Sequence, residues 1–110
     1  MRQSLPAWNV NAFAAAAARA VLEQPPSWAD GERALNRERR EDLFRRLSAL
    51  PGAAVLPSGA NFLLFRLAGA PSGLAARLLK NHGIALRDCS NYPGLENGGW
   101  FRAGVRTPEE

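Results

Sequence analysis

The spacing of apolar residues changes at Pro51–Gly52, and this change constrains the fold more than any other feature of the chain. Before it, apolar side chains recur about every 3.6 residues, as in helices that bury one face. After it, short apolar runs alternate with turn residues, which indicates strands. Two helices followed by grouped strands predict an α+β fold with two layers, in which helices cover a mostly antiparallel sheet of about four strands.

A first helix is predicted over residues 10–23, because this stretch is rich in alanine and contains neither glycine nor proline. Asn9 or Asn11 can cap its N-terminus, and the two prolines in 24–26 end it. Its side chains are small on every face, so we expect it to pack closely against a neighbouring element.

A second, longer helix is expected to start at a cap, either Ser27 or Asp30, and to run to about Leu50. Acidic residues interrupt the arginine-rich run 37–40, so we interpret it as a solvated helix face and expect no nucleic-acid partner. The predicted buried stripe of this helix consists of Leu35, Leu43, Phe44, Leu47 and Leu50.

The second half of the chain is predicted to hold four strands and one further helix. The strand over 61–67 is apolar on both faces, which is typical of a central position in a sheet. The further helix opens at 70–72 and stops at Gly83. The other strands are expected at 53–56, 84–89 and 100–106, and the helix is expected to bury Leu74, Ala75, Leu78 and Leu79.

The last residues have the spacing of a helix start. Thr107 is a suitable N-cap, Pro108 suits the first helical position, and Glu110 completes a capping box. We therefore expect a last helix to begin here, and we expect the chain to be a piece of a longer protein.

Composition narrows the class of protein. With 110 residues, the chain is one small domain or part of one. Its longest apolar stretch, 12–18, is shorter than the about 20 residues that cross a bilayer, so no membrane partner is expected. The single cysteine, Cys89, excludes an internal disulfide and suits the cytoplasm. The net charge is +4, and all 14 basic residues except Lys80 are arginine, which indicates either a GC-rich genome or an anionic partner.

Two arginines are the candidate binding residues. Arg102 alternates with apolar residues in the fourth predicted strand, and Arg87 does so in the third. If the apolar sets face the helices, both guanidinium groups emerge together on the uncovered face. There they can bind a carboxylate or phosphate through bidentate hydrogen bonds. The alternative is that each arginine pairs with a surface carboxylate such as Asp88.

No residue is predicted to perform covalent catalysis, to bind a cofactor or to hold a metal. The only histidine, His82, lies at a helix end, where it suits the helix dipole. Cys89 is expected to be a small buried residue. The chain has no zinc-site spacing, no phosphate-binding glycine loop and no Gly-x-Ser-x-Gly nucleophile motif.

Taken in order, several motifs resemble the C-terminal part of fold-type I pyridoxal-phosphate enzymes of the histidinol-phosphate aminotransferase-like branch. The segment 87–95, Arg-Asp-Cys-Ser-Asn-Tyr-Pro-Gly-Leu, is most similar to the threonine-phosphate decarboxylases of cobalamin biosynthesis. The motifs that carry the resemblance are 6–14, 36–41, 57–65, 83–89 and 101–110.

The resemblance implies a role for each part of the chain. Residues 1–26 would belong to the large-domain or dimer-interface side of a homodimeric enzyme, and 27–110 would form its small domain, truncated at the last helix. Arg87 and Arg102 would bind the anionic groups of a small phosphorylated amino acid. The lysine that binds pyridoxal phosphate would lie upstream, since Lys80 sits on the small-domain helix. This segment alone would therefore be inactive.

For the complete enzyme, the resemblance implies decarboxylation of L-threonine O-3-phosphate to aminopropanol phosphate. The small domain of a histidinol-phosphate-type aminotransferase is the alternative. A third hypothesis, from another class, is a non-enzymatic basic module that binds nucleic acid or a protein through the arginine-rich helix.

Overall fold

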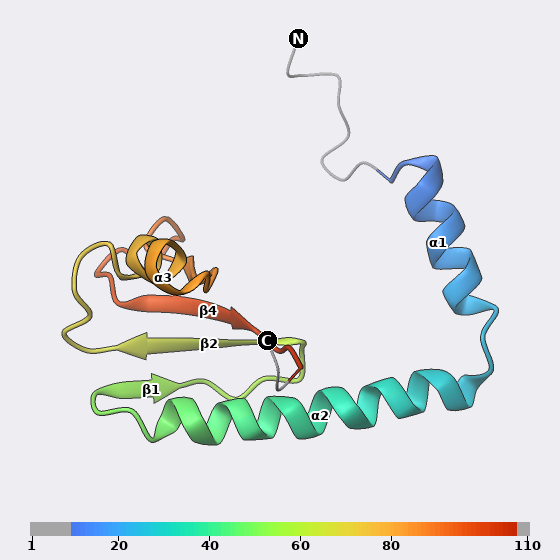
Figure 1. Ribbon diagram of the computed structural model, residues 1–110, viewed down its shortest axis with the longest axis horizontal. Helices are drawn as coiled ribbons and strands as arrows, with labels where there is room; N and C mark the ends of the chain where they lie inside the picture. Colours follow the sequence, from blue (N-terminus) through green and yellow to red (C-terminus); the bar gives the residue numbers. More distant parts are fainter. Residues whose placement is uncertain (1–9, 108–110) are drawn as a thin grey trace, which may run out of the picture. The chain divides into compact units, whose positions relative to one another are not determined.

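The computed structural model describes residues 10–107, which form three helices and one four-stranded sheet (Figure 1). These described residues confirm the predicted α+β fold with an antiparallel sheet. By its contacts the chain divides into two compact units, 1–33 and 34–110, and the boundary falls within α2. The elements are α1 (Ala12–Leu22), α2 (Pro26–Ser48), β1 (Ala53–Val55), β2 (Phe62–Leu67), α3 (Leu74–His82), β3 (Arg87–Asp88) and β4 (Trp100–Gly104).

Local interactions define α1. The Asn11 side chain accepts a hydrogen bond from the Ala14 N–H at 2.8 Å, so Asn11 is the N-cap. Asn9, the other predicted cap, lies outside the described residues. An exposed ion pair joins Arg19 to Glu23 near the C-terminus. None of the residues of α1 is buried in this structure, so alanine propensity and capping, not a core, account for the helix.

The predicted start of α2 is wrong, since neither Ser27 nor Asp30 caps it. The helix begins at Pro26, whose fixed φ and missing N–H suit the first helical position. It ends at Ser48, and of its predicted stripe only Leu43, Phe44 and Leu47 are half-buried, whereas Leu35 and Leu50 are exposed. Neither α2 nor any other helix within residues 10–107 is long and apolar enough to cross a bilayer.

The sheet has the strand order β1-β2-β4-β3, and every neighbouring pair is antiparallel. The predicted central position of β2 is confirmed, because it pairs with β1 on one side and with β4 on the other. β4 is shorter than predicted, although the Val105 N–H still donates to the Asn61 carbonyl at 2.8 Å. The last helix expected after Thr107 falls on residues outside the described range.

β3 is much shorter than the predicted 84–89. The Ile84 N–H donates to the Leu78 carbonyl, and the Gly83 N–H donates to the Leu79 carbonyl. These bonds close the C-terminus of α3 around Gly83, whose φ is +69°. The backbone at Ile84 thus serves the helix end, and the strand starts only at Arg87.

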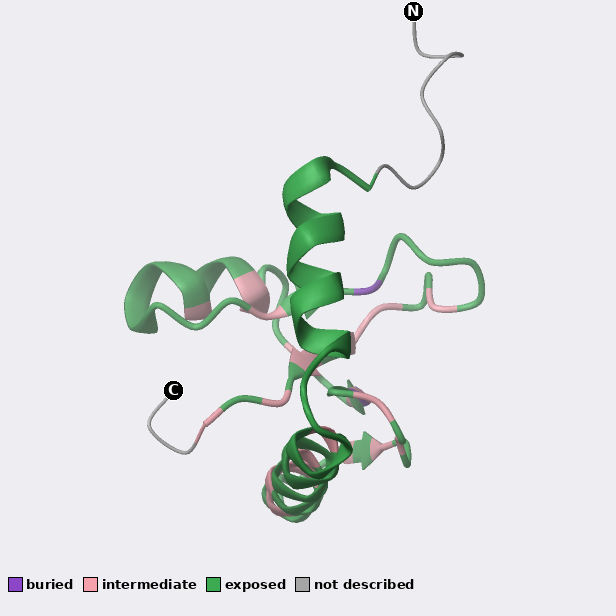
Figure 2. Cartoon of the chain, turned by 90° about the vertical axis from the view of Figure 1, so that its right-hand side faces the viewer, coloured by how far each residue is buried: buried purple, intermediate pink, exposed green. Residues whose placement is uncertain are grey.

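One face of the sheet forms the core. Leu63 is fully buried, and Phe65 packs against Phe101 with ring centroids 5.8 Å apart. The register pairs Phe65 with Phe101 and Leu63 with Ala103, so these side chains share a face. Cys89, just after β3, is buried as predicted. Among residues 10–107, the buried ones all lie in the sheet or in the segment directly after β3 (Figure 2).

α3 is covered only in part. Leu74, Ala75 and Leu78 are half-buried, but Leu79 is 56% exposed, so its predicted burial is wrong. The half-buried positions lie in the first five residues of the helix, and residues 79–82 are all exposed. The stripe therefore contacts the rest of the fold through its N-terminal part.

Gly99 is required by the backbone next to β4. Its φ is +75°, and a Cβ built there would lie 2.8 Å from the Leu67 carbonyl oxygen. We expect Gly99→Ala to lower the free energy of unfolding by about 2 kcal/mol. Urea denaturation followed by circular dichroism measures this change. Gly59→Ala is the control, because no atom lies within 4 Å of that Cβ. Equal stability of the two variants would contradict the prediction.

Candidate anion-binding site

The two predicted arginines are cross-strand partners. The β3–β4 register places Arg87 opposite Arg102, and cross-strand partners project from the same face of a sheet. Arg102 also pairs with Leu64 of β2, whereas Leu63 and Phe101 occupy the opposite, buried face. Both arginine side chains are exposed. The register therefore brings the two cations to the non-core face, as the alternation predicts; their role in binding stays a prediction.

Each guanidinium lies against an aromatic ring. The Cζ atom of Arg102 is 5.2 Å from the ring centroid of Phe62, on β2. The Cζ atom of Arg87 is 5.7 Å from the ring centroid of Tyr92, and its Nη2 donates to Asn91 Oδ1 at 3.1 Å. The two guanidinium groups thus have different neighbours, one on β2 and the other in the segment after β3. Sequence reasoning missed all three partners, because neither diagonal strand contacts nor loop geometry can be derived from alternation.

The predicted alternative, pairing with Asp88, is not formed. Asp88 pairs with Phe101 in the register, and its Oδ1 accepts a hydrogen bond from the Ser90 N–H at 2.9 Å. This backbone bond, with the Ser90 hydroxyl, holds the pKa of the Asp88 carboxyl below its ordinary value. Within residues 10–107, all the ion pairs lie along α1 and α2. Arg87 and Arg102 therefore form no ion pair within the described residues, although the charge of Arg87 acts on the Asp88 carboxyl.

A third arginine belongs to the same face. Arg66 pairs with Trp100 across β2 and β4, two residues along from the row that contains Arg102. It is exposed, and no carboxylate in the described part of the chain forms an ion pair with it. Sequence reasoning did not select Arg66, although its spacing from Phe62 and Leu64 in β2 was a usable signal. The face as a whole is strongly cationic.

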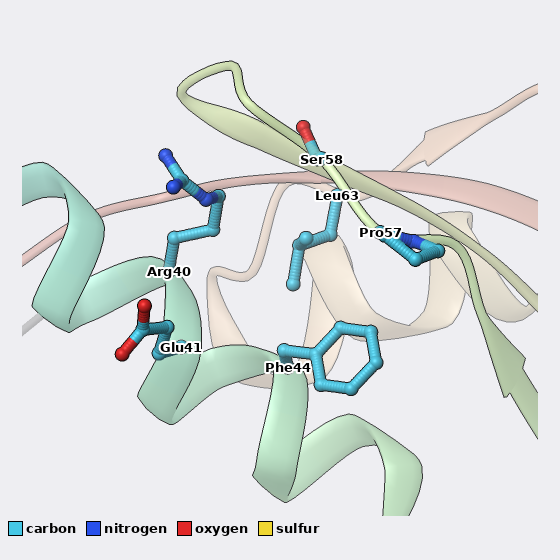
Figure 3. A pocket seen from close by; sticks show the side chains of 6 residues that line it. All are labelled: Arg40, Glu41, Phe44, Pro57, Ser58 and Leu63. Atoms are coloured by element: carbon cyan, nitrogen blue, oxygen red, sulfur yellow. The ribbon is translucent and has the colours of Figure 1, made fainter.

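A pocket of about 240 Å³ lies between α2 and the β1–β2 connection (Figure 3). Arg40 Nη1 donates to the Ala60 carbonyl and to Asn36 Oδ1, both at 3.3 Å. Ser58 Oγ accepts a hydrogen bond from the Ala60 N–H at 3.0 Å. Arg40 thus links α2 to the β1–β2 connection through a hydrogen bond. Its side chain is half-buried, so the prediction that it lies on a solvated helix face is wrong. The lining residues are Arg40, Glu41, Phe44, Pro57, Ser58 and Leu63.

The cysteine and the histidine are not part of the candidate anion site. Cys89 is buried, and its Sγ lies 3.7 Å from the Arg87 carbonyl oxygen. His82 lies in the last turn of α3 beside Lys80, a position that suits a cation. Among the described residues, no three His, Cys, Asp or Glu side chains gather closely enough to hold a metal ion.

Comparison with curated proteins relates the chain to two kinds of enzyme. It is 37% identical over 106 residues to a threonine-phosphate decarboxylase from Salmonella typhimurium, with 96% of this chain aligned. It is 40% identical over 105 residues to histidinol-phosphate aminotransferase 1 from Ralstonia nicotianae. The chain spans only 28% and 27% of the lengths of these relatives. No family model matches the sequence.

Solved structures support the same relationship. L-Threonine-O-3-phosphate decarboxylase from Porphyromonas gingivalis matches 66% of this chain and 22% of its own, with a TM-score of 0.61 and 30% identity. A decarboxylase from Sulfurospirillum multivorans matches 93% of this chain and 29% of its own, with a TM-score of 0.71. At 22% identity, the latter shows the fold alone.

Proposed function

Because the chain corresponds to the C-terminal portion of class I pyridoxal-phosphate enzymes of the histidinol-phosphate aminotransferase and threonine-phosphate decarboxylase type, we propose that it supplies the substrate-anion site of such an enzyme. The observation that carries the proposal is the Arg87–Arg102 cross-strand pair, neither member of which forms an ion pair within the described residues. Two guanidinium groups on one face of a sheet offer bidentate donors to carboxylate or phosphate.

The residues of this chain do not fit the covalent anchor of pyridoxal phosphate. That cofactor, when bound, supplies an electron sink for reactions at an amino-acid Cα. Lys80 is the only lysine of the sequence, and it is exposed on the last turn of α3 rather than on a strand that carries the arginines. We place the anchoring lysine and the chemical step on the large domain of a longer enzyme, which we call the intact enzyme.

The arginines would act by binding and orientation. Arg102 lies against Phe62 on β2, and Arg87 lies against Tyr92 in the segment that follows β3, so each guanidinium has its own aromatic neighbour. Two separately supported guanidinium groups suit a substrate with two anionic groups, one for each arginine. Fixing both groups would hold the bonds at Cα in one orientation, which lowers the entropic part of the barrier.

For the reaction, we propose decarboxylation of a phosphorylated amino acid such as L-threonine O-3-phosphate. The substrate carries both a carboxylate and a phosphate, which matches the two arginines, and the chain is similar to threonine-phosphate decarboxylases in sequence and structure. The alternative is amino transfer on a histidinol-phosphate-type substrate, which the similarity to histidinol-phosphate aminotransferases favours.

An assay of the intact enzyme separates these two reactions. We expect L-threonine O-3-phosphate to release carbon dioxide without consumption of 2-oxoglutarate. Consumption of 2-oxoglutarate with histidinol phosphate, and no carbon dioxide release, would favour the aminotransferase. Failure of both reactions would overturn the proposed enzyme class.

We further propose that α1 contacts the large domain or the second subunit of a homodimer. Phe13 is 88% exposed, and Val10 and Leu22 are also mostly exposed, an arrangement that favours contact with another surface.

A further inference from the structure

Arg87 is held by two neutral groups that follow it closely in sequence. Asn91 Oδ1 accepts from its Nη2 at 3.1 Å, and the Tyr92 ring centroid lies 5.7 Å from its Cζ. Both partners come from residues 90–99, here named the 90–99 loop, which connects β3 to β4. We propose that Asn91 and Tyr92 are positioning residues that hold the Arg87 guanidinium ready for an anionic substrate group, an inference that rests on the proposed function.

The partners restrain the arginine without neutralising it. A free arginine side chain has many rotamers, and part of this rotamer entropy is lost whenever an anion fixes it. A carboxamide oxygen and an aromatic face restrain the guanidinium but bring no negative charge. The contact to Asn91 uses one of five N–H donors, so an edge of the guanidinium stays available for bidentate binding.

The 90–99 loop is itself fixed by internal hydrogen bonds. The Tyr92 N–H donates to the Cys89 carbonyl at 3.0 Å, and buried Cys89 anchors this end of the loop. The Leu95 N–H then donates to the Tyr92 carbonyl at 3.0 Å. Both carboxylate oxygens of Glu96 accept from the Gly94 N–H at 2.9 Å. Asn91 and Tyr92 are therefore presented to Arg87 by a structured loop.

The exposure of Tyr92 and its contact with Arg87 fit a positioning role. Its side chain is 42% exposed, so it is not a core residue. Its ring lies beside the guanidinium of Arg87, whose Cζ is 5.7 Å from the ring centroid. A similar cation–π contact occurs at Arg102, whose Cζ lies 5.2 Å from the ring centroid of Phe62. Each arginine of the pair thus has its own aromatic support.

The test is a phosphate titration of the 110-residue chain, with the Nε–Hε resonances of Arg87 and Arg102 followed by NMR. We expect inorganic phosphate to shift both resonances saturably. Tyr92→Leu should weaken the affinity measured at Arg87 by about twofold to fivefold, the size of an exposed cation–π contact, and should increase the fast motion of Nε. Tyr92→Phe keeps the ring and should restore both values.

Substitutions of Asn91 test the second contact, because removing the acceptor and adding a negative charge should weaken phosphate binding to different extents. Asn91→Ala removes the acceptor and should weaken binding modestly. Asn91→Asp should weaken it more, because the new carboxylate forms an ion pair with Arg87 and competes with phosphate. Asn81→Ala, on the exposed end of α3, is the matched control and should change nothing. Thermal unfolding of every variant checks that the fold is retained. If Tyr92→Leu is unfolded, the Asn91 variants alone test the positioning role.

The outcomes separate the positioning role from the site itself. If wild-type chain shows no phosphate response, or Arg87→Ala responds as the wild type does, the proposed anion site fails. If Arg87→Ala abolishes the response while Tyr92→Leu, Asn91→Ala and Asn91→Asp all bind as the wild type does, the site stands and the positioning role is overturned.

Discussion

Replacing Arg102 with alanine is expected to lower kcat/KM of the intact enzyme about 100-fold. The guanidinium would donate two hydrogen bonds to a charged substrate group, and charged hydrogen bonds contribute about 1.5 kcal/mol or more each. Losing both costs about 3 kcal/mol of transition-state stabilisation, which corresponds to this factor. Steady-state kinetics with L-threonine O-3-phosphate measures it. Arg102→Lys should recover only part of the rate, because an ammonium group lacks the planar fork.

Arg77→Ala is the matched control for this change. Arg77 is an exposed arginine on α3, so its replacement removes the same charge from a different element. We expect its kcat/KM to stay within about twofold of wild type, as is usual for surface substitutions. If Arg77→Ala and Arg102→Ala lose activity equally, net charge rather than a specific contact controls the rate, and the proposed role of Arg102 is wrong.

Local patterns were sufficient for most of the secondary structure. The continuous apolar run in β2 predicts a central strand, and the sheet order agrees, although only the face with Leu63 and Phe65 is buried. The start of α2 could not be predicted, because Ser27 and Asp30 have good capping chemistry but Pro26 already has helical geometry. β3 could not be bounded either, since the end of α3 uses the backbone at Ile84.

In the candidate site, too, local sequence patterns predict some features and tertiary structure determines the others. Period-two alternation predicts that Arg87 and Arg102 share a face, because strand geometry alone determines it, and the register agrees. The contacts with Phe62 and Tyr92 depend on which strands are neighbours and on how the 90–99 loop turns. No periodicity in one sequence encodes those relations. Alternation thus identifies the cations, and tertiary structure identifies what orients them.

Phe101→Ala is expected to lower the free energy of unfolding of residues 34–110 by about 3 to 5 kcal/mol. Phe101 is 3% exposed, and it packs against Phe65 at the centre of a core that has few fully buried side chains. It also pairs with Asp88 and so lies beside the Arg87–Arg102 row, on β4. Small units are marginally stable, so this loss should abolish cooperative unfolding at room temperature.

Urea denaturation followed by tryptophan fluorescence and circular dichroism measures the effect. Phe13→Ala is the control: it deletes the same atoms at a site that is 88% exposed, and we expect a change of less than about 0.5 kcal/mol. Phe101→Leu should fall between the two, because leucine fills part of the cavity. The phosphate response at Arg102 should disappear together with the fold in Phe101→Ala. A cooperative transition of wild-type stability in that variant would mean that the buried face of the sheet is not what stabilises the strands carrying the arginines.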